Sequence, residues 1–123
     1  MLAILELIMP FIDSKITGTV SEEKKEAIKT RLGQAISILN KSETYLMVGF
    51  EDNYDLFMAG QKLEKGAYVS VSLFGNASSD AYDKMTAKIC EILADELAIP
   101  DSNHFYQFLH HIYNKSSIQP LTQ

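Results

Sequence analysis

Apolar residues follow two different spacings along the chain, and these spacings predict alternating strands and helices. The segment 10–17, PFIDSKIT, is rich in β-branched and aromatic residues and is typical of a strand that begins at Pro10. Residues 22–40 carry apolar side chains at helical spacing after Ser21, a suitable N-cap residue. The nearly continuous apolar run 44–50, TYLMVGF, is typical of a strand covered on both faces, so we expect it to be central.

The second half of the chain repeats this order of elements. Residues 67–74, AYVSVSLF, alternate with period two, which predicts a strand, and residues 82–97 have helical spacing. The last strand is predicted at 104–108, HFYQF. The polar segment 51–66 connects the two halves and has room for a short strand at 55–58.

Two β-α-β units define the expected fold class. Strands joined through a helix become parallel neighbours with right-handed crossovers. We therefore expect an α+β fold, in which a four-stranded mixed sheet carries both helices on one face. The other face would be bare, with apolar surface added by Phe50, Tyr68 and Phe74. Because an uncovered apolar face indicates a partner, we expect a homo-oligomer.

Composition narrows the possible classes of function. The 123 residues are 46% hydrophobic, enough for a single domain with its own core. A net charge of −5 argues against nucleic-acid binding, and no apolar run is long enough to span a membrane. Cys90 is the single cysteine, and the adjacent His110 and His111 would point apart in an extended segment. We expect a cytoplasmic protein without metal or cofactor.

Residues 1–9 need a separate interpretation. The apolar start MLAILELI contains Glu6 and lacks the basic n-region of a secretory signal. It is either a short extra strand or tail, or it lies upstream of a start codon at Met9. We therefore divide the chain into an N-terminal extension, residues 1–9, and one domain, residues 10–123.

Three short motifs, together with the repeated β-α-β plan, carry a resemblance to a known family. Met9-Pro10-Phe11-Ile12, Leu46-Met47-Val48 and Ser72-Leu73-Phe74-Gly75 resemble the macrophage migration inhibitory factor (MIF) family of the tautomerase superfamily, especially its bacterial and other microbial members. The resemblance covers residue 9 to about residue 100. It implies a homotrimer whose sheets form a barrel around a channel, with active sites at subunit interfaces. It also implies keto-enol tautomerisation of phenylpyruvate-type 2-keto acids, as in phenylpyruvate tautomerases and dopachrome isomerases.

The resemblance gives Pro10 the role of general acid/base. A free α-amino group titrates near pH 8, and burial or nearby cations lower its pKa, so a terminal proline can be neutral at working pH. Its ring fixes the direction of the lone pair, which suits moving a proton between two atoms of one substrate. If residues 1–9 stay attached, the Pro10 nitrogen is an amide, and Pro10 is an ordinary strand-entry proline.

The resemblance assigns substrate binding to residues in both halves. Lys41 matches a lysine that binds the substrate carboxylate, although a cation after a helix is also favoured by the helix dipole alone. Leu73 matches a position whose backbone N–H meets the same carboxylate. Asn76, just beyond, is better explained as a turn residue.

The C-terminal part departs from the family pattern of a tyrosine, an asparagine two residues later and a tryptophan-containing motif. An ungapped alignment puts Phe105 and Gln107 at the first two positions, and Tyr106 replaces Phe105 if the strand slips by one residue. The chain has no tryptophan, and Tyr113 stands in the motif if the preceding loop is shortened.

Three functions remain open. The first is a tautomerase with Pro10 as base, Lys41 as anion clamp and a pocket shared with a neighbouring subunit. The second is a non-catalytic trimeric binding or signalling protein in which the extension blocks Pro10. The third is hydration, dehalogenation or decarboxylation of a small unsaturated acid. That chemistry usually recruits further Arg or Glu residues, and because the chain has one arginine, Arg31, this function ranks lowest.

Overall fold

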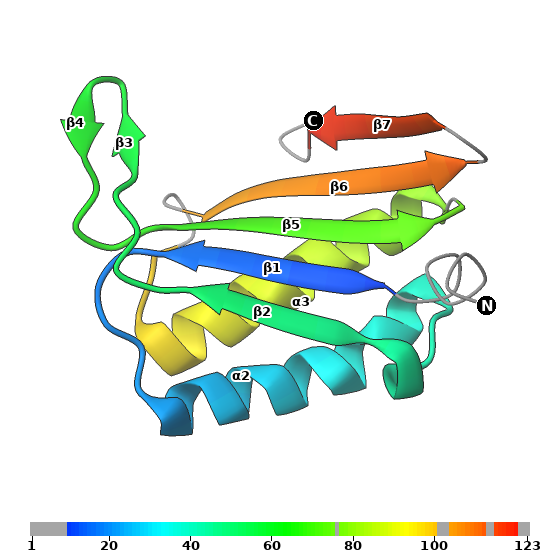
Figure 1. Ribbon diagram of the computed structural model, residues 1–123, viewed down its shortest axis with the longest axis horizontal. Coiled ribbons are helices and arrows are strands. Elements are labelled where there is room, and N and C mark those ends of the chain that lie inside the picture. The colour runs from blue at the N-terminus through cyan, green and yellow to red at the C-terminus, as the bar shows by residue number, and fades with distance from the viewer. Residues whose placement is uncertain (1–9, 76, 101–103, 113–114, 121–123) are drawn as a thin grey trace.

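A five-stranded sheet in the order β2-β1-β5-β6-β7 carries two helices on one of its faces (Figure 1). This computed structural model describes residues 10–75, 77–100, 104–112 and 115–120, of which residue 74 and residues 104–112 and 115–120 are described by their backbone. The strands of the sheet are β1 Phe11–Ile16, β2 Met47–Glu51, β5 Ala67–Phe74, β6 His104–Ile112 and β7 Lys115–Pro120. The helices are α2 Glu22–Ala35, α3 Ser79–Leu97 and the 3₁₀ turns η1 Ile36–Leu39 and η2 Glu43–Tyr45.

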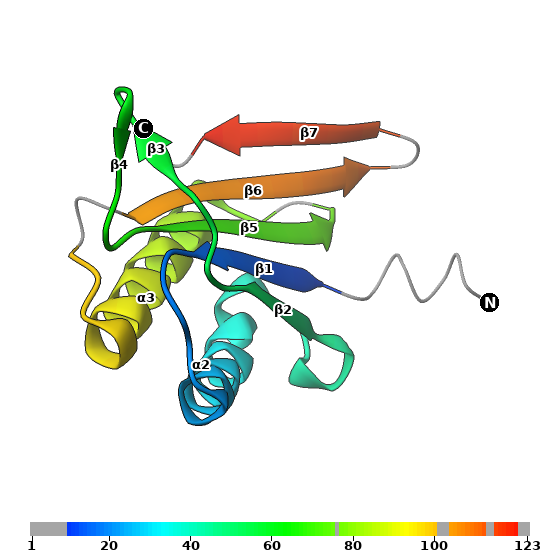
Figure 2. The same cartoon turned by 60° about the vertical axis from the view of Figure 1, so that its left-hand side comes forward.

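The pairing of the strands confirms the predicted α+β fold. β1 and β2 are parallel, as are β5 and β6, and the two units meet through the antiparallel pair β1–β5. β7 pairs antiparallel with β6 and adds a fifth strand that the sequence pattern did not predict. A short hairpin, β3 Phe57–Met58 and β4 Gln61–Lys62, projects beyond the end of the sheet where β1 ends (Figure 1 and Figure 2).

Side-chain caps begin both helices, and left-handed residues follow their ends. The Ser21 hydroxyl oxygen accepts a hydrogen bond from the Lys24 N–H at 3.1 Å, as its position in the sequence predicts. The first helix continues as the 3₁₀ turn η1, and Asn40 ends it with φ 59°. Ser78 caps α3, and Ala98 follows that helix with φ 56°.

The expectation that residues 44–50 form a central strand is wrong in two respects. Residues 43–45 form the 3₁₀ turn η2, because the Ser42 hydroxyl oxygen accepts a hydrogen bond from the Thr44 N–H at 3.1 Å. β2 is an edge strand: in the described part of the chain it pairs with β1 and with no other strand. Its apolar character is explained by Val48 and Phe50, which pack against the core, whereas Met47 is 48% exposed.

The core lies between the sheet and the two helices. Apolar side chains from alternate positions of β1 and β5 meet the inner faces of α2 and α3. The largest fully buried side chains are those of Ile12, Ile16, Ile28, Leu32, Ile36, Leu73, Met85, Ile89, Ile92 and Leu93.

Among the side chains that the structure describes, those on the sheet face that points away from the helices are less apolar than the sequence pattern predicted. Lys15 lies on this face, with its Nζ 3.0 Å from Asp13 Oδ2 and 3.2 Å from Glu51 Oε2. Tyr68 pairs in register with Lys15 and therefore lies on this face, as predicted, whereas Phe50 packs on the helix side of the sheet. The ion pairs on this face therefore weaken the argument for an oligomer that rested on a bare apolar surface.

Candidate active site

Pro10 is buried at the point where the chain enters β1. Its carbonyl oxygen accepts a hydrogen bond from the Met47 N–H at 2.9 Å, and the next residue, Phe11, pairs with both Met47 and Ser72. Proline is tolerated here because the first residue of a strand need not donate to the ladder. The structure thus places the ring of Pro10 in the packed end of the sheet.

Leu73 lies beside Pro10 because β5 runs antiparallel to β1. Phe11 pairs with Ser72, so the next step along both strands brings Leu73 alongside Pro10. The Leu73 side chain is 2% exposed and belongs to the core, which leaves its backbone as the part available for chemistry. After Phe74 the chain turns at Gly75, whose φ is +84°.

Lys41 lies at the same end of the sheet. It is half-buried and follows Asn40 in the short segment between η1 and η2. Both turns lie near the beginning of β1 (Figure 1), since the segment leads into Met47 and its bond to Pro10. The structure therefore brings together at one end of the sheet three of the residues assigned by the resemblance.

The register of β6 separates Phe105 and Gln107 from Pro10 within one chain. Phe105 pairs with Tyr68, which in turn pairs with Lys15 of β1, five residues from Pro10. At about 3.3 Å per residue this offset is about 17 Å, and the corresponding offset for Gln107 is about 10 Å.

The remaining sequence assignments have different outcomes. Tyr106, the alternative to Phe105, pairs with Val69 and is also distant from the start of β1. Tyr113 and Asn76 lie outside the described residues. Cys90 is half-buried and packs against the core.

Tyr82 supports this end of the sheet in a way that the sequence pattern did not reveal. The pattern treats it as one apolar position of a helix, and it is indeed 8% exposed. Its hydroxyl oxygen accepts a hydrogen bond from the Ala77 N–H at 2.9 Å, and this bond fixes the connection between β5 and α3. Burial raises the pKa of the Tyr82 hydroxyl above its ordinary value.

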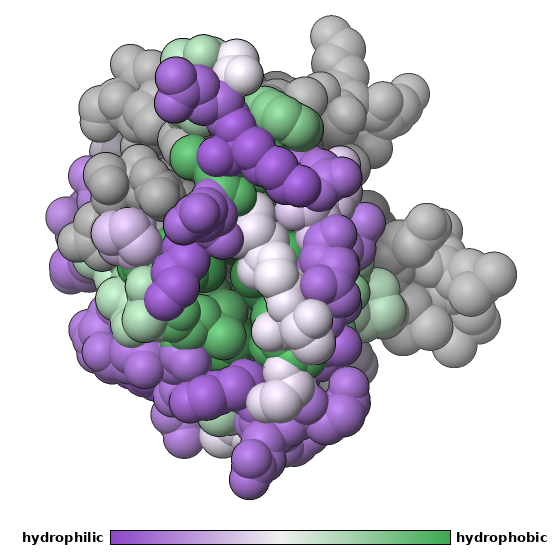
Figure 3. Space-filling model, turned by 90° about the vertical axis from the view of Figure 1, so that its left-hand side faces the viewer, coloured by the Kyte–Doolittle hydropathy of each residue, from purple (hydrophilic) through white to green (hydrophobic). Residues whose placement is uncertain are grey.

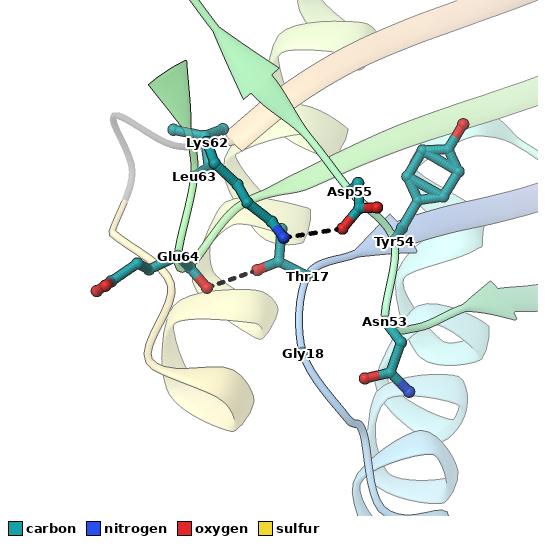
Figure 4. Close-up of a pocket in the computed structure, with 8 residues that line it drawn as sticks. All are labelled: Thr17, Gly18, Asn53, Tyr54, Asp55, Lys62, Leu63 and Glu64. Atoms are coloured by element: carbon teal, nitrogen blue, oxygen red, sulfur yellow. Dashed lines mark hydrogen bonds and ion pairs between the residues drawn. The ribbon is translucent and has the colours of Figure 1, made fainter.

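A cavity of about 570 Å³ lies at the opposite end of β1, beside the hairpin (Figure 4). Figure 3 shows this end of the molecule, where hydrophobic surface lies between hydrophilic side chains. The cavity is lined by Thr17, Gly18, Asn53, Tyr54, Asp55, Lys62, Leu63 and Glu64. Thr17 is seven residues from Pro10, about 23 Å along the strand, so this cavity and the Pro10 site are separate.

Two contacts join polar groups that line this cavity. Lys62 Nζ lies 3.2 Å from Asp55 Oδ1, and the Thr17 hydroxyl donates to the Glu64 carbonyl oxygen at 2.9 Å. The cavity therefore lies where the chain segments 17–18, 53–55 and 62–64 meet and are joined by these contacts.

Metal-binding clusters and membrane-spanning helices are absent from the described part of the chain. Within residues 10–75, 77–100, 104–112 and 115–120, no three His, Cys, Asp or Glu side chains gather in a way that could hold a metal ion. None of the helices in this part of the chain is long and apolar enough to cross a bilayer.

Two β-α-β repeats that place both helices on one sheet face form the tautomerase fold, and this is the class of protein to which the architecture points. The model of the macrophage migration inhibitory factor (MIF) family matches residues 9–116. The chain therefore belongs to the MIF family of the tautomerase superfamily, as the sequence motifs predicted.

Solved structures agree with this assignment at the level of the fold. MIF2 from Leishmania major is 22% identical, with a TM-score of 0.76 over 86% of this chain and 90% of that chain. Pt0534 inactivated by 2-oxo-3-pentynoate is 16% identical, with a TM-score of 0.75 over 83% and 85%. The W0 fused 4-OT wild-type symmetric trimer is 16% identical, with a TM-score of 0.72 over 80% and 84%. No curated protein sequence matches the chain.

Proposed function

We propose that the chain is a keto-enol tautomerase for phenylpyruvate-type 2-keto acids, with the Pro10 nitrogen as acid/base once residues 1–9 are removed. The observation that carries this proposal is the gathering of buried Pro10, Leu73 and Lys41 at one end of the sheet. The family match, which begins at residue 9, supports a functional unit that begins near Pro10. The inactivation of Pt0534 by 2-oxo-3-pentynoate supports a 2-keto acid as the substrate class.

Each residue has a defined part in the proposed reaction. The Lys41 ammonium and the Leu73 N–H bind the substrate carboxylate and thereby hold the neighbouring keto group near Pro10. The neutral Pro10 amine removes a proton from the carbon next to the keto carbon. The electron pair of that C–H bond forms the C=C bond of the enol, and the keto oxygen receives the proton from the Pro10 ammonium.

A homotrimer is part of the proposal because one chain does not bring all the assigned residues together. Phe105 and Gln107 lie about 17 Å and about 10 Å along the sheet from Pro10, so a site that contains them takes them from a neighbouring subunit. The symmetric trimer of the similar W0 fused 4-OT supports this assembly.

One observation favours a second function, a non-catalytic trimeric binding or signalling protein. In the chain as written, Met9 precedes Pro10, so the Pro10 nitrogen is a peptide nitrogen without basicity. The two functions therefore differ in the state of one peptide bond.

The test compares the full chain with a chain that begins at Pro10, each verified by intact mass, in an enol-keto assay with phenylpyruvate. We expect turnover with a free Pro10, and we expect Pro10→Ala at the new terminus to lower kcat by about 10²-fold or more. Lys41→Ala should raise KM by roughly 10-fold or more, because it removes a charged hydrogen-bond donor.

The matched control is Lys84→Ala, since Lys84 is an exposed lysine on α3 that pairs with Asp80. Its KM should equal that of the parent chain. Absence of turnover with a verified free Pro10 would refute the enzyme and leave the binding protein as the remaining proposal.

A further inference from the structure

The segment 40–46, which carries Lys41, is fixed firmly at its two ends. At the start, Asn40 donates its N–H to the Ser37 carbonyl oxygen at 2.9 Å, and the buried Leu39 anchors η1 in the core. At the end, Met47 donates to the Pro10 carbonyl oxygen at 2.9 Å. Between these anchors the side chains of residues 42–45 are exposed. Hydrogen bonds within η2 give this part of the segment its shape, and a contact with α2 would fix its position against the helix.

Such a contact exists between Glu43 and the backbone of α2. The Glu43 side chain lies over Gly33, so close that a Cβ added to Gly33 would come 2.6 Å from Glu43 Cδ and 3.1 Å from its Cγ. Gly33 is buried in the last turn of α2, which continues into η1, and glycine is less stable than alanine within a helix, so it needs a packing reason. The space that the missing Cβ leaves is the space that Glu43 fills.

We propose that Gly33 is a positioning residue for Lys41. Because Gly33 has no Cβ, the Glu43 side chain packs directly on the backbone of α2. This packing contact holds the turn η2 and the preceding Lys41 against the helix. The inference rests on the proposed function, because Lys41 matters as the residue that binds the substrate carboxylate. A fixed lysine loses less freedom when it binds that carboxylate, so the contact lowers KM and leaves the proton transfer at Pro10 unchanged.

The contact between Gly33 and Glu43 is tested with Gly33→Ala, Glu43→Ala and the double variant. Gly33→Ala should fold, because its methyl group displaces the far end of one exposed side chain and suits a helix interior. Gln34→Ala, at the neighbouring exposed position of α2, is the control. KM and kcat are measured with phenylpyruvate on the form of the chain that turns it over.

We expect each single substitution to raise KM by roughly 3-fold to 10-fold while kcat stays within about 2-fold. The double variant should have the KM of a single variant, because both substitutions remove the same contact. Gln34→Ala should leave both constants unchanged. An unchanged KM in either single variant, a fall in kcat in place of the rise in KM, or effects that multiply in the double variant would overturn the proposal.

A second measurement separates this inference from the proposed function. In the full chain, Gly33→Ala and Glu43→Ala should shift the same backbone amide resonances in residues 41–46, and Gln34→Ala should not. If the parent protein has no activity, the proposed function fails, while these amide shifts still show whether Gly33 and Glu43 fix the segment. If the amide resonances of residues 41–46 do not shift, the proposal that Gly33 and Glu43 fix this segment is refuted.

Discussion

Removing the hydroxyl of Tyr82 should weaken the connection between β5 and α3 by a defined amount. Tyr82→Phe keeps the buried ring, so no large cavity forms, but the Ala77 N–H loses its acceptor at 2.9 Å. The net contribution of one such hydrogen bond is about 0.5–1.5 kcal/mol. Because Ala77 is half-buried, we expect a loss in the middle of this range, about 1 kcal/mol in the free energy of unfolding. For a chain of this length the melting temperature should fall by roughly 3–6 °C.

Urea unfolding followed by circular dichroism measures this loss, with Tyr54→Phe as the matched control. Tyr54 is 37% exposed, and its ring, which phenylalanine retains, is what Lys15 Nζ contacts at 5.8 Å from the centroid. The control should stay within about 0.5 kcal/mol of the parent chain. If Tyr82→Phe is as stable as the parent, the hydrogen bond to Ala77 has no structural role and the reasoning is wrong.

The pH dependence provides an independent check on Tyr82. Burial raises the pKa of its hydroxyl in the folded chain above the unfolded value of about 10. The stability that comes from a raised pKa is fully present below the unfolded pKa and is lost as the pH rises through the folded pKa. The parent chain should therefore lose stability above about pH 10 more steeply than Tyr82→Phe. Identical alkaline slopes for the two proteins would contradict the burial of this hydroxyl.

Two further predictions concern loops. Ala59 has φ 53° at the tip of the β3–β4 hairpin, so Ala59→Asn should stabilise the hairpin by about 0.5–1 kcal/mol and slow hydrogen exchange at the Leu63 N–H. Faster or unchanged exchange there would contradict the strain at Ala59. The Val20 N–H donates to Asp52 Oδ2 at 3.0 Å and is the main cause of the lowered pKa of Asp52. Its contribution is present above the unfolded pKa of about 4 and is lost as the pH falls through the lower, folded pKa, so the stability difference between the parent and Asp52→Asn should shrink in acid. A difference that is constant down to pH 2 would argue against this role.

The alternation of side chains predicts the strands that have one buried face, and it fails where the environment of the strand changes. β5 covers residues 67–74 as predicted, because its valines all point to the helices. The apolar run 44–50 led to the wrong prediction of a central strand, because periodicity does not distinguish a strand buried on both faces from a strand at the edge of a sheet. Ser42 followed by Glu43 is a cap signal that could have predicted η2. β7 lacks a strong alternating pattern and depends on pairing with β6.

The part of the candidate site that depends only on the order and pairing of the strands could be predicted from the sequence. A β-α-β repeat brings Pro10, Lys41 and Leu73 to one end of the sheet whatever the details of side-chain packing. The offset of Phe105 depends on the register of β6 against β5, which a sequence pattern does not specify. The contact between Gly33 and Glu43 is likewise a packing detail, visible in the sequence only as an unexplained glycine inside a helix.

The position of β1 between β2 and β5 has a consequence for how the protein is made. β1 pairs with β2 along one edge and with β5 along the other, and β5, which ends at Phe74, is synthesised after both of the other strands. Until those residues leave the ribosome, the nascent chain exposes a row of unpaired backbone groups beside an apolar strand. Folding of the first half therefore waits for the second, and the intervening stage is the one at which this chain depends most on protection from aggregation.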